Sequence, residues 1–559
     1  MKLVRSSLWL GLIAVWLIRL LSLSAYPLMD TTEARYGEMA RIMVETGNWI
    51  TPQFDYGVPF WGKPPLFAWM SALGINTLGV NELAVRFPHW LLGLITVAML
   101  AWFARRQGIS GLKAAFVLST SVIFTIASGA VMTDMALTFS LTLAMIGFYL
   151  AWHEHRHWTY VGFIGLAVGM LAKGPLVIVL MGLAILPWVV IVFGFRTGLK
   201  RLFTELPLIR GTLLMLVISV PWYVLAERAT PGFLDYFIVG EHIKRFLVSG
   251  WQGDLYGTAH ERLRGTIWLY ALAGFMPWSL VLIYRLMNPK RSRQWWRFSA
   301  ETLYYVLWGI APMVLFTLAG NILPAYVLPG IPGLVLWLLS PPRTRKTNAD
   351  EKYTAKGLSQ HHASLHKKPM GERTSGNIVA SNFVGHATNT DMPMRGASHS
   401  GVIVPCTYPQ TSHNTSSFAH EGVKTSRVEP LSQAYQSVER HPIAATGNQR
   451  WLAMGGFIPL ALIIAVVVIQ LGADEKRSDK GLLNKAQHDL PVYYVGKRPF
   501  SGQFYSRGQA RLVDEVTHFP DKFQIIGKPK QVSRWANQSG WRCLLNWQGK
   551  SSRGLYVCQ

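Results

Sequence analysis

Long stretches almost free of charged residues constrain the fold of this chain more than any other feature. Several approach the roughly 20 apolar residues that a helix needs to cross a bilayer: Leu8–Ala25, Leu176–Phe193, Gly211–Ala226, Thr266–Tyr284, Leu303–Leu318 and Trp451–Leu471. Shorter or interrupted candidates are Leu91–Phe103, Ala114–Val131, Ala136–Trp152, Tyr160–Leu171 and Leu323–Leu339. A soluble core has no use for so many apolar segments. The sequence therefore predicts a mainly α-helical, polytopic membrane protein with about eleven spans.

The first span has some features of a signal peptide, because Lys2 and Arg5 precede its apolar run. The run is long for such a peptide, and Ser24-Ala25-Tyr26 is a weak cleavage site. We therefore expect an uncleaved anchor.

The positive charge of the chain predicts its orientation in the membrane. A net charge of +25 could suggest a nucleic-acid partner, but the basic clusters fall in alternate loops between the spans. These clusters are Arg105-Arg106, His153–His157, Arg196–Arg210, Arg285–Arg297 and Arg343–Lys346. Lys and Arg are enriched in cytoplasmic loops. With the N-terminus inside, every cluster lies inside, the C-terminal tail lies outside, and no nucleic acid is needed to explain the charge.

Composition also divides the chain into regions. We expect a transmembrane module at residues 1–340 with external loops at 26–87 and 227–264, and a last span at 451–472. Residues 341–450 hold half of the sixteen histidines, many small polar residues and no long apolar run, which is typical of a disordered insertion, here cytoplasmic. Residues 473–559 contain short β-rich runs, namely VYYVG, GQFYS, FQIIG, CLLNW and LYVC. They predict a small external β or α+β domain.

The three cysteines fit this topology. Cys406 falls in the cytoplasmic insertion, where a free thiol is expected. Cys543 and Cys558 fall in the external tail, where a disulfide between them is permitted.

The first external loop is rich in the ionisable residues that the spans lack. Its segment Thr31–Glu45 has apolar residues at helical spacing, which predicts an amphipathic helix lying along the membrane surface. On that helix, Arg41 is spaced for surface ion pairs with Glu38 and Glu45, so we leave Arg41 out of the candidate site. Pro64-Pro65 can open a second helix, Leu66–Leu78.

Three further external pieces carry polar groups and should converge with this loop on one face. They are the turn at Thr133-Asp134, the loop at Glu227–Gly265 and the turn around Tyr326. Ionisable residues at membrane level are costly and usually functional. The sequence therefore predicts one site on the outer face.

The motifs in these pieces resemble a known family. The segments TEARYGEMARIMVETGNWITP, WGKPPL, TDMALTF, AKGP, GEHIKRF and LPAYVLP follow one another in the order found in bacterial glycosyltransferases of the protein-mannosyltransferase-like group. The aminoarabinose transferases that modify lipid A are their best-known members. The resemblance covers roughly Met1–Leu339 and, with gaps, the last span and tail. It implies a GT-C-type inner-membrane enzyme that passes a sugar from a polyprenyl-phosphate donor to a lipid, polysaccharide or protein of the cell envelope, on the periplasmic side.

The expected chemistry assigns roles to the external residues. The donor leaves as a phosphate, so positive charge aimed at that phosphate should help. The resemblance assigns donor-phosphate binding to Arg35 and Lys63, and His242 and Arg245 are further candidates. A carboxylate should deprotonate or orient the acceptor, acting from the face opposite the leaving group in an inverting reaction. The candidates for that carboxylate are Glu33, Asp30 and Asp134, and those for substrate binding are Tyr36, Glu241 and Tyr326.

Departures from the family pattern leave the substrates open. Aminoarabinose transferases have the pattern Asp-Glu-x-Arg-Tyr, in which this chain has Thr32 in place of the Asp. They also have Glu-Lys-Pro-Pro, in which this chain has Gly62 in place of the Glu. Their Lys-Leu-Pro turn is Ile322-Leu323-Pro324 here. These losses surround the expected pocket, so neither the sugar nor the acceptor follows from the resemblance.

Other readings of the same residues remain open. Asp30 and Glu33 are also spaced as a helix cap, and Asp134 could cap its own span. Asp254 and His260 could bind a divalent cation with Glu241, but their spacing does not identify a metal site, and the cofactor is unassigned. The alternative function is transport or flipping of a lipid-linked or anionic solute. A transporter would place charges near the bilayer midplane, whereas this chain has them at span ends.

Overall fold

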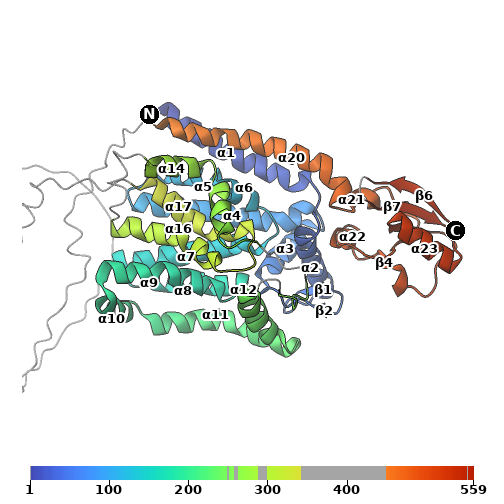
Figure 1. Ribbon diagram of the computed structural model, residues 1–559, viewed down its shortest axis with the longest axis horizontal. Coiled ribbons are helices and arrows are strands. Elements are labelled where there is room, and N and C mark those ends of the chain that lie inside the picture. Colours follow the sequence, from blue (N-terminus) through green and yellow to red (C-terminus); the bar gives the residue numbers. More distant parts are fainter. Residues whose placement is uncertain (1, 249–250, 257–261, 288–298, 341–448, 550–551) are drawn as a thin grey trace, which may run out of the picture. The chain divides into compact units, whose positions relative to one another are not determined.

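The computed structural model describes residues 2–248, 251–256, 262–287, 299–340, 449–549 and 552–559. The predicted insertion at 341–450, with Cys406, lies almost wholly outside these residues. The described part is mainly helical, with a small sheet near the C-terminus (Figure 1).

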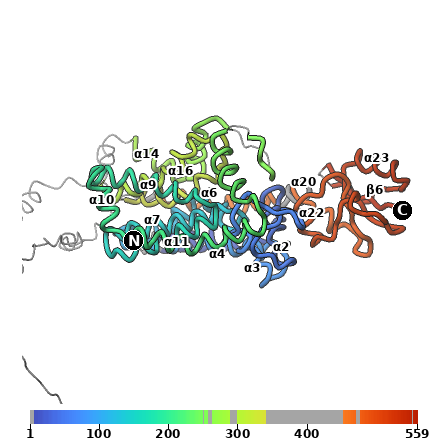
Figure 2. The backbone as a smooth tube through the Cα atoms, turned by 90° about the horizontal axis from the view of Figure 1, so that it is seen from below, coloured from blue at the N-terminus to red at the C-terminus, as the bar shows by residue number. Residues whose placement is uncertain are grey.

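Each apolar stretch expected to span the membrane is helical. The helices are α1 (Lys2–Ala25), α4 (Glu82–Arg106), α5 (Gly111–Ser119), α6 (Val122–Ala127), α7 (Thr133–His153), α8 (Trp158–Lys173), α9 (Leu176–Phe193), α11 (Leu208–Ala229), α13 (Thr266–Gly274), α14 (Trp278–Met287), α16 (Ala300–Thr317), α17 (Ile331–Leu339) and α20 (Phe457–Lys476). Many of them run lengthwise beside one another in both views (Figures 1 and 2).

The number of full-length spans is smaller than the number of apolar stretches. Within the described residues, 7 helices are long and apolar enough to cross a membrane, or 8 if α13 and α14, bent by 109°, form one span. Shorter apolar helices are Leu66–Leu78, Trp158–Lys173 and Pro324–Leu339. The sequence count of about eleven included the last two of these and the bent pair, whereas Leu66–Leu78 was assigned to the first external loop.

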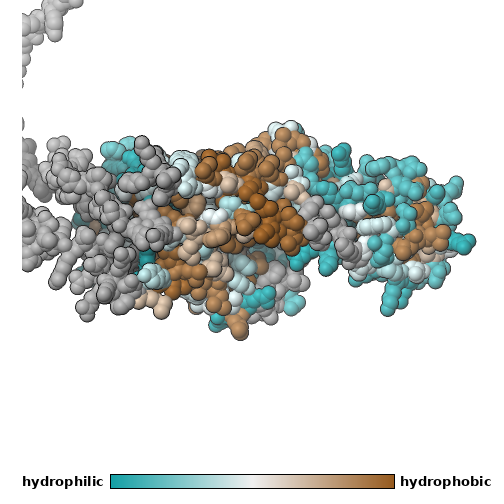
Figure 3. All heavy atoms as spheres, turned by 90° about the horizontal axis from the view of Figure 1, so that it is seen from above, coloured by the Kyte–Doolittle hydropathy of each residue, from teal (hydrophilic) through white to brown (hydrophobic). Residues whose placement is uncertain are grey.

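The helices present apolar side chains outward as well as inward. On α11, Leu213 and Val217 are 61% and 63% exposed, and α20 exposes Ile464 and Val468. Figure 3 shows the resulting hydrophobic surface over the helices and a more hydrophilic surface over the C-terminal residues. A continuous apolar exterior is unfavourable in water and favourable in lipid. The chain is therefore a multi-pass membrane protein.

Helices α7 and α8 form a tight antiparallel hairpin. A Cβ atom on Gly147 would lie 2.4 Å from the backbone nitrogen of Gly162, and one on Gly165 would lie 2.6 Å from that of Ala144. Only glycine permits so close an approach, as at many membrane helix interfaces. The hairpin brings the start of α7 beside the end of α8.

The first external loop folds into α2 (Thr32–Thr46), a short hairpin of β1 (Gln53–Asp55) and β2 (Val58–Pro59), and α3 (Leu66–Leu78). Contrary to the sequence prediction, α2 does not lie along a surface. Its Glu38 and Arg41 are 0% and 3% exposed, and its apolar face packs against Phe504 of the C-terminal region. The expected pairs of Arg41 with Glu38 and Glu45 do form, but the pair with Glu38 is buried.

The C-terminal region contains a five-stranded mixed sheet, which confirms the expected α+β character. The strand order is β4-β3-β5-β7-β6. The strands are β3 (Val492–Tyr494), β4 (Arg511–Leu512), β5 (Phe523–Gly527), β6 (Cys543–Gln548) and β7 (Gly554–Cys558), with helices α21 (Lys480–Leu483), α22 (Phe500–Tyr505) and α23 (Pro529–Ser539). Strand β3 is parallel to β4 and β5, and β7 is antiparallel to β5 and β6.

The structure tests two sequence predictions for this region, a disulfide and a strand. The disulfide between Cys543 and Cys558 is confirmed, with the two residues opposite each other on β6 and β7 and their Cα atoms 4.0 Å apart. The run GQFYS is not a strand but part of helix α22. A Cβ atom on Gly502 would lie 2.4 Å from the Tyr494 hydroxyl, so this glycine permits a close tertiary contact rather than ending a strand.

Candidate functional site

The candidate site lies where one end of several helices meets the loops that the sequence predicts to be external. Asp134 is in the first turn of α7 and Lys173 is the last residue of α8. Lys63 precedes α3, Glu241 and His242 lie in the helix η1 (Asp235–Lys244), and Tyr326 lies in η2 (Pro324–Gly330). The membrane topology therefore brings residues from distant parts of the sequence to one level.

Glu241 is the centre of the first charge cluster. Its carboxylate accepts a hydrogen bond from Lys63 Nζ at 2.7 Å and one from Arg245 Nη1 at 2.9 Å. The same Arg245 nitrogen lies 3.2 Å from Asp254 Oδ2. Burial tends to raise the pKa of Glu241, but Lys63 and Arg245 outweigh it and lower the pKa to about 2. Glu241 is thus ionised at neutral pH and fixes the two cations.

Asp134 and Lys173 form the second charge pair. Lys173 Nζ donates to Asp134 Oδ1 at 2.6 Å, and both side chains are less than a tenth exposed. The same ammonium lies 4.6 Å from the centre of the Tyr326 ring, which is a cation–π distance. The charges of four residues from the two clusters affect the pKa of Tyr326, namely Lys63, Arg245, Asp134 and Glu241. The two clusters are therefore neighbours.

His242 lies between these clusters without adding charge. Its Nδ1 is 2.8 Å from the Phe237 carbonyl oxygen, and its Nε2 is 3.2 Å from that of Lys173. Burial lowers the pKa of His242 from its usual value. Through these two contacts the ring positions η1 against the end of α8.

Arg35 supplies a cation that no carboxylate neutralises among the described residues. Its Nη1 donates to the Tyr256 carbonyl oxygen at 2.6 Å, and its guanidinium lies 5.2 and 5.8 Å from the ring centres of Tyr36 and Phe60. Tyr256 in turn donates its backbone N–H to Asp254. Arg35 therefore borders the Glu241 cluster, and within the described residues its positive charge is not compensated by a carboxylate. Tyr36 itself is 6% exposed and packs in the aromatic core.

The structure places Glu33 outside this group. Glu33 accepts hydrogen bonds from Nε and Nη2 of Arg86, at 2.9 and 2.7 Å. The Arg86 side chain is fully buried and also donates to the carbonyl oxygens of Leu23, Tyr26 and Pro27. Although burial tends to raise the pKa of Glu33, the charge of Arg86 holds it below its usual value. Glu33 thus anchors the start of α2 to α4, and Arg86 in turn holds the end of α1.

Asp30 contacts the C-terminal region rather than the charge clusters. It accepts the backbone N–H of Ser501 at 3.0 Å, and its other oxygen accepts the Ser501 hydroxyl. Burial raises the pKa of Asp30. Asp30 therefore connects the first external loop to the C-terminal region.

Sequence reasoning missed two charged residues that determine this arrangement. Lys173 lies in one of the motifs and at the end of a predicted span but was given no role in the site, and Arg86, near the start of α4, was not considered. In both cases the available signal was a charge near the end of a membrane helix. No group of three or more His, Cys, Asp or Glu residues able to hold a metal occurs in the described part of the chain, and His260 lies outside it.

Comparisons with known proteins agree with the resemblance seen in the motifs. Residues 8–237 match the family model described as dolichyl-phosphate-mannose-protein mannosyltransferase. The undecaprenyl phosphate-alpha-4-amino-4-deoxy-L-arabinose arabinosyl transferases of Enterobacter sp. (strain 638) and Edwardsiella ictaluri are each 31% identical to this chain. The matches cover 60% and 54% of this chain, and 61% and 53% of the relatives. The chain thus spans little more than half the length of these relatives.

The fold is similar to that of a solved relative. The crystal structure of ArnT from Cupriavidus metallidurans bound to undecaprenyl phosphate superposes with a TM-score of 0.65 at 17% identity, over 99% of this chain and 98% of that one. The apo form of the same protein gives a TM-score of 0.63. The chain is therefore similar in sequence to the aminoarabinose transferases and shares the helical fold of the solved one, in agreement with the resemblance of its motifs.

Proposed function

We propose that the chain is an inner-membrane glycosyltransferase that moves a sugar from a polyprenyl-phosphate donor to an acceptor of the cell envelope. The observation that carries this proposal is the group of cations at one end of the helices. Lys63, Arg245 and Lys173 are each paired with a carboxylate, whereas Arg35 has no such partner among the described residues. A phosphate group would complement that surplus charge.

The arrangement suits the departure of a lipid phosphate. As the bond between the sugar's anomeric carbon and the phosphate oxygen breaks, negative charge grows on the phosphate. Arg35 and Lys63 would stabilise this charge, and Arg245 would assist through its contact with Glu241. Since polyprenyl phosphate is a stable anion, no proton is needed for its departure.

Among the candidate carboxylates, Asp134 is the one we assign to the acceptor. Glu33 and Asp30 are bound to Arg86 and Ser501, whereas Asp134 lies next to the donor cations. As the acceptor hydroxyl attacks the anomeric carbon, its proton would pass to the Asp134 carboxylate. Lys173 would hold that carboxylate in place, and Tyr326 and Glu241 would border the substrates.

We place the site and the C-terminal sheet on the periplasmic face. The alternation of basic loops supports this orientation, and the disulfide between Cys543 and Cys558 supports it independently, because disulfides persist in oxidising compartments. The relatives' names identify undecaprenyl-phosphate aminoarabinose as their donor. Because this chain has Thr32 and Gly62 where those enzymes have carboxylates, we leave the sugar and the acceptor unspecified.

The test is a comparison of envelope lipids and glycans by mass spectrometry. A deletion strain should lack a sugar-modified component that is restored by the wild-type gene and not by Asp134→Asn. The control is Lys244→Gln, since Lys244 is an exposed cation of η1, the helix that carries Glu241, and this variant should restore the component fully. Loss of an unmodified solute or lipid from one leaflet, with every sugar modification intact, would instead identify a transporter.

A further inference from the structure

A second charged site lies at the opposite end of the helices from the candidate active site. Arg156, His157, Tyr160, Pro207 and Arg210 line an open pocket of about 330 Å³. Arg156 and His157 come just before α8, whose other end carries Lys173. Arg210 is in the first turn of α11. In the predicted topology this end faces the cytoplasm.

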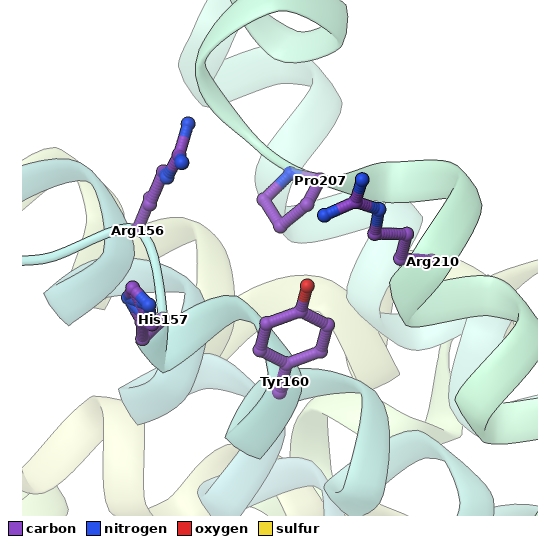
Figure 4. A pocket seen from close by; sticks show the side chains of 5 residues that line it. All are labelled: Arg156, His157, Tyr160, Pro207 and Arg210. Carbon is purple, nitrogen blue, oxygen red and sulfur yellow. The ribbon is translucent and has the colours of Figure 1, made fainter.

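The pocket is positively charged, and no carboxylate of the described residues neutralises its arginines. The nearby acids are engaged elsewhere: Glu154 accepts two hydrogen bonds from Arg106, and Glu205 lies 3.6 Å from Arg201. Within the described chain, neither Arg156 nor Arg210 has a recorded carboxylate partner. In Figure 4 the Arg210 guanidinium and the Tyr160 hydroxyl point into the same space beside Pro207, while Arg156 stands at the rim.

The backbone adds to this positive potential. The pocket adjoins the N-termini of both α8 and α11, and each helix N-terminus carries a partial positive charge. Guanidinium groups pair with phosphate oxygens through two parallel hydrogen bonds. Arginines, a tyrosine hydroxyl and two helix N-termini together match a phosphate group.

The surroundings of the pocket are those of a lipid headgroup. Ile209 and Leu213 are 87% and 61% exposed on α11, beside Arg210. The preceding helix α10 (Phe195–Glu205) is amphipathic, with Phe195 and Phe203 both more than three fifths exposed. Such a helix lies in the interfacial plane of a membrane. A phosphate in the pocket could therefore belong to a lipid whose acyl chain runs along α11.

We propose that this pocket binds the phosphate of an anionic membrane phospholipid. Basic pockets between membrane helices on the cytoplasmic side recognise such headgroups. The volume is at the lower end of the range for ligand pockets, which suits a headgroup. The proposal rests on no part of the proposed transferase activity.

The test is lipid binding to the full chain, purified in mild detergent and measured by native mass spectrometry. The wild-type protein should bind one phosphatidylglycerol about tenfold or more tightly than phosphatidylcholine. Replacing both pocket arginines, Arg156→Gln with Arg210→Gln, should weaken phosphatidylglycerol binding about tenfold and leave phosphatidylcholine binding unchanged. Tyr160→Phe, a milder variant, should weaken it by about threefold through loss of one donor.

Two controls separate this site from general surface charge. Arg196→Gln with Lys200→Gln removes two exposed cations of α10, and it should leave the affinity within about twofold of wild type. An equal loss in this control, or equal wild-type affinity for the two lipids, would overturn the proposal. Competition by sn-glycerol 3-phosphate at the same concentration as the lipid would assign the pocket to a soluble phosphate and overturn the lipid assignment, whereas failure to compete supports it.

Discussion

Glu33 offers a sharp test of how the structure divides the carboxylates between folding and chemistry. The residue lies within a motif that the resemblance places near the donor, yet its carboxylate is held by Arg86. We expect Glu33→Gln to act mainly on stability. The Arg86 side chain is fully buried, and the variant leaves its charge without a counterion.

The structure gives the size of the effect. Removing one partner of a buried ion pair costs about 3–5 kcal/mol. The glutamine oxygen still accepts one of the two hydrogen bonds, and three backbone carbonyl oxygens remain on Arg86. The loss should therefore lie near the lower end, at about 3 kcal/mol, which lowers the melting temperature by several degrees.

Activity of the folded fraction should change far less. The pKa of Glu33 lies below its usual value, and a general base works best with a pKa near the operating pH. We expect sugar transfer per folded molecule, measured well below the melting temperature, to fall by less than about tenfold in Glu33→Gln and by about a hundredfold or more in Asp134→Asn.

A double-mutant cycle provides the control. The double variant Glu33→Gln with Arg86→Gln should lose less unfolding free energy than the sum of the two single variants' losses. We expect the difference to be at least about 1 kcal/mol. Wild-type thermal stability together with a hundredfold loss of transfer in Glu33→Gln would refute the structural role and return Glu33 to catalysis.

Three further predictions concern other parts of the molecule. Because the folded pKa of Glu241 is about 2 against a usual value of 4.5, its ionised form stabilises the fold above about pH 4.5 by about 3 kcal/mol. The stability difference between wild type and Glu241→Gln, measured by thermal unfolding, should therefore shrink as the pH falls from about 5 towards 2. Reduction of the disulfide between Cys543 and Cys558, which are separated by 15 residues, should cost about 3 kcal/mol and speed proteolysis of the C-terminal sheet relative to the oxidised protein. Ser501→Ala should leave Asp30 short of a donor and cost about 1–3 kcal/mol, seen as faster proteolysis between the last span and the sheet, while unchanged cleavage would contradict that contact.

The sequence predicted features that depend on one segment at a time. Apolar length located the helices, since hydropathy alone determines whether a segment can enter lipid. The predicted topology places the loops and turns that carry Lys63, Asp134, Glu241 and Tyr326 on the same side of the membrane. It therefore predicted that these residues would meet. The sequence could not predict which residues form ion pairs, because the partners of Lys63 and Glu33 lie far away along the chain.

Tertiary contacts that the sequence does not reveal explain the two main errors of the sequence-based prediction. Helix α2 has an amphipathic pattern, which is equally typical of a membrane surface and of a helix between two domains. Only the structure shows Phe504 packed on its apolar face. Similarly, the GQFYS run contains aromatic residues that favour a strand. In the structure its glycine, Gly502, is in helix α22 and contacts Tyr494 of strand β3.

The glycine contacts between α7 and α8 affect how natural variants of this protein should be interpreted. Gly165 is about 12 Å along the helix from Lys173 and is buried against α7. A change to alanine there would be classed as conservative by any measure of side-chain chemistry. Yet the added methyl group would meet the backbone of Ala144 and push apart the two helices whose ends hold Asp134 and Lys173 together. Distance from the charged residues is therefore a poor guide to which substitutions the site tolerates.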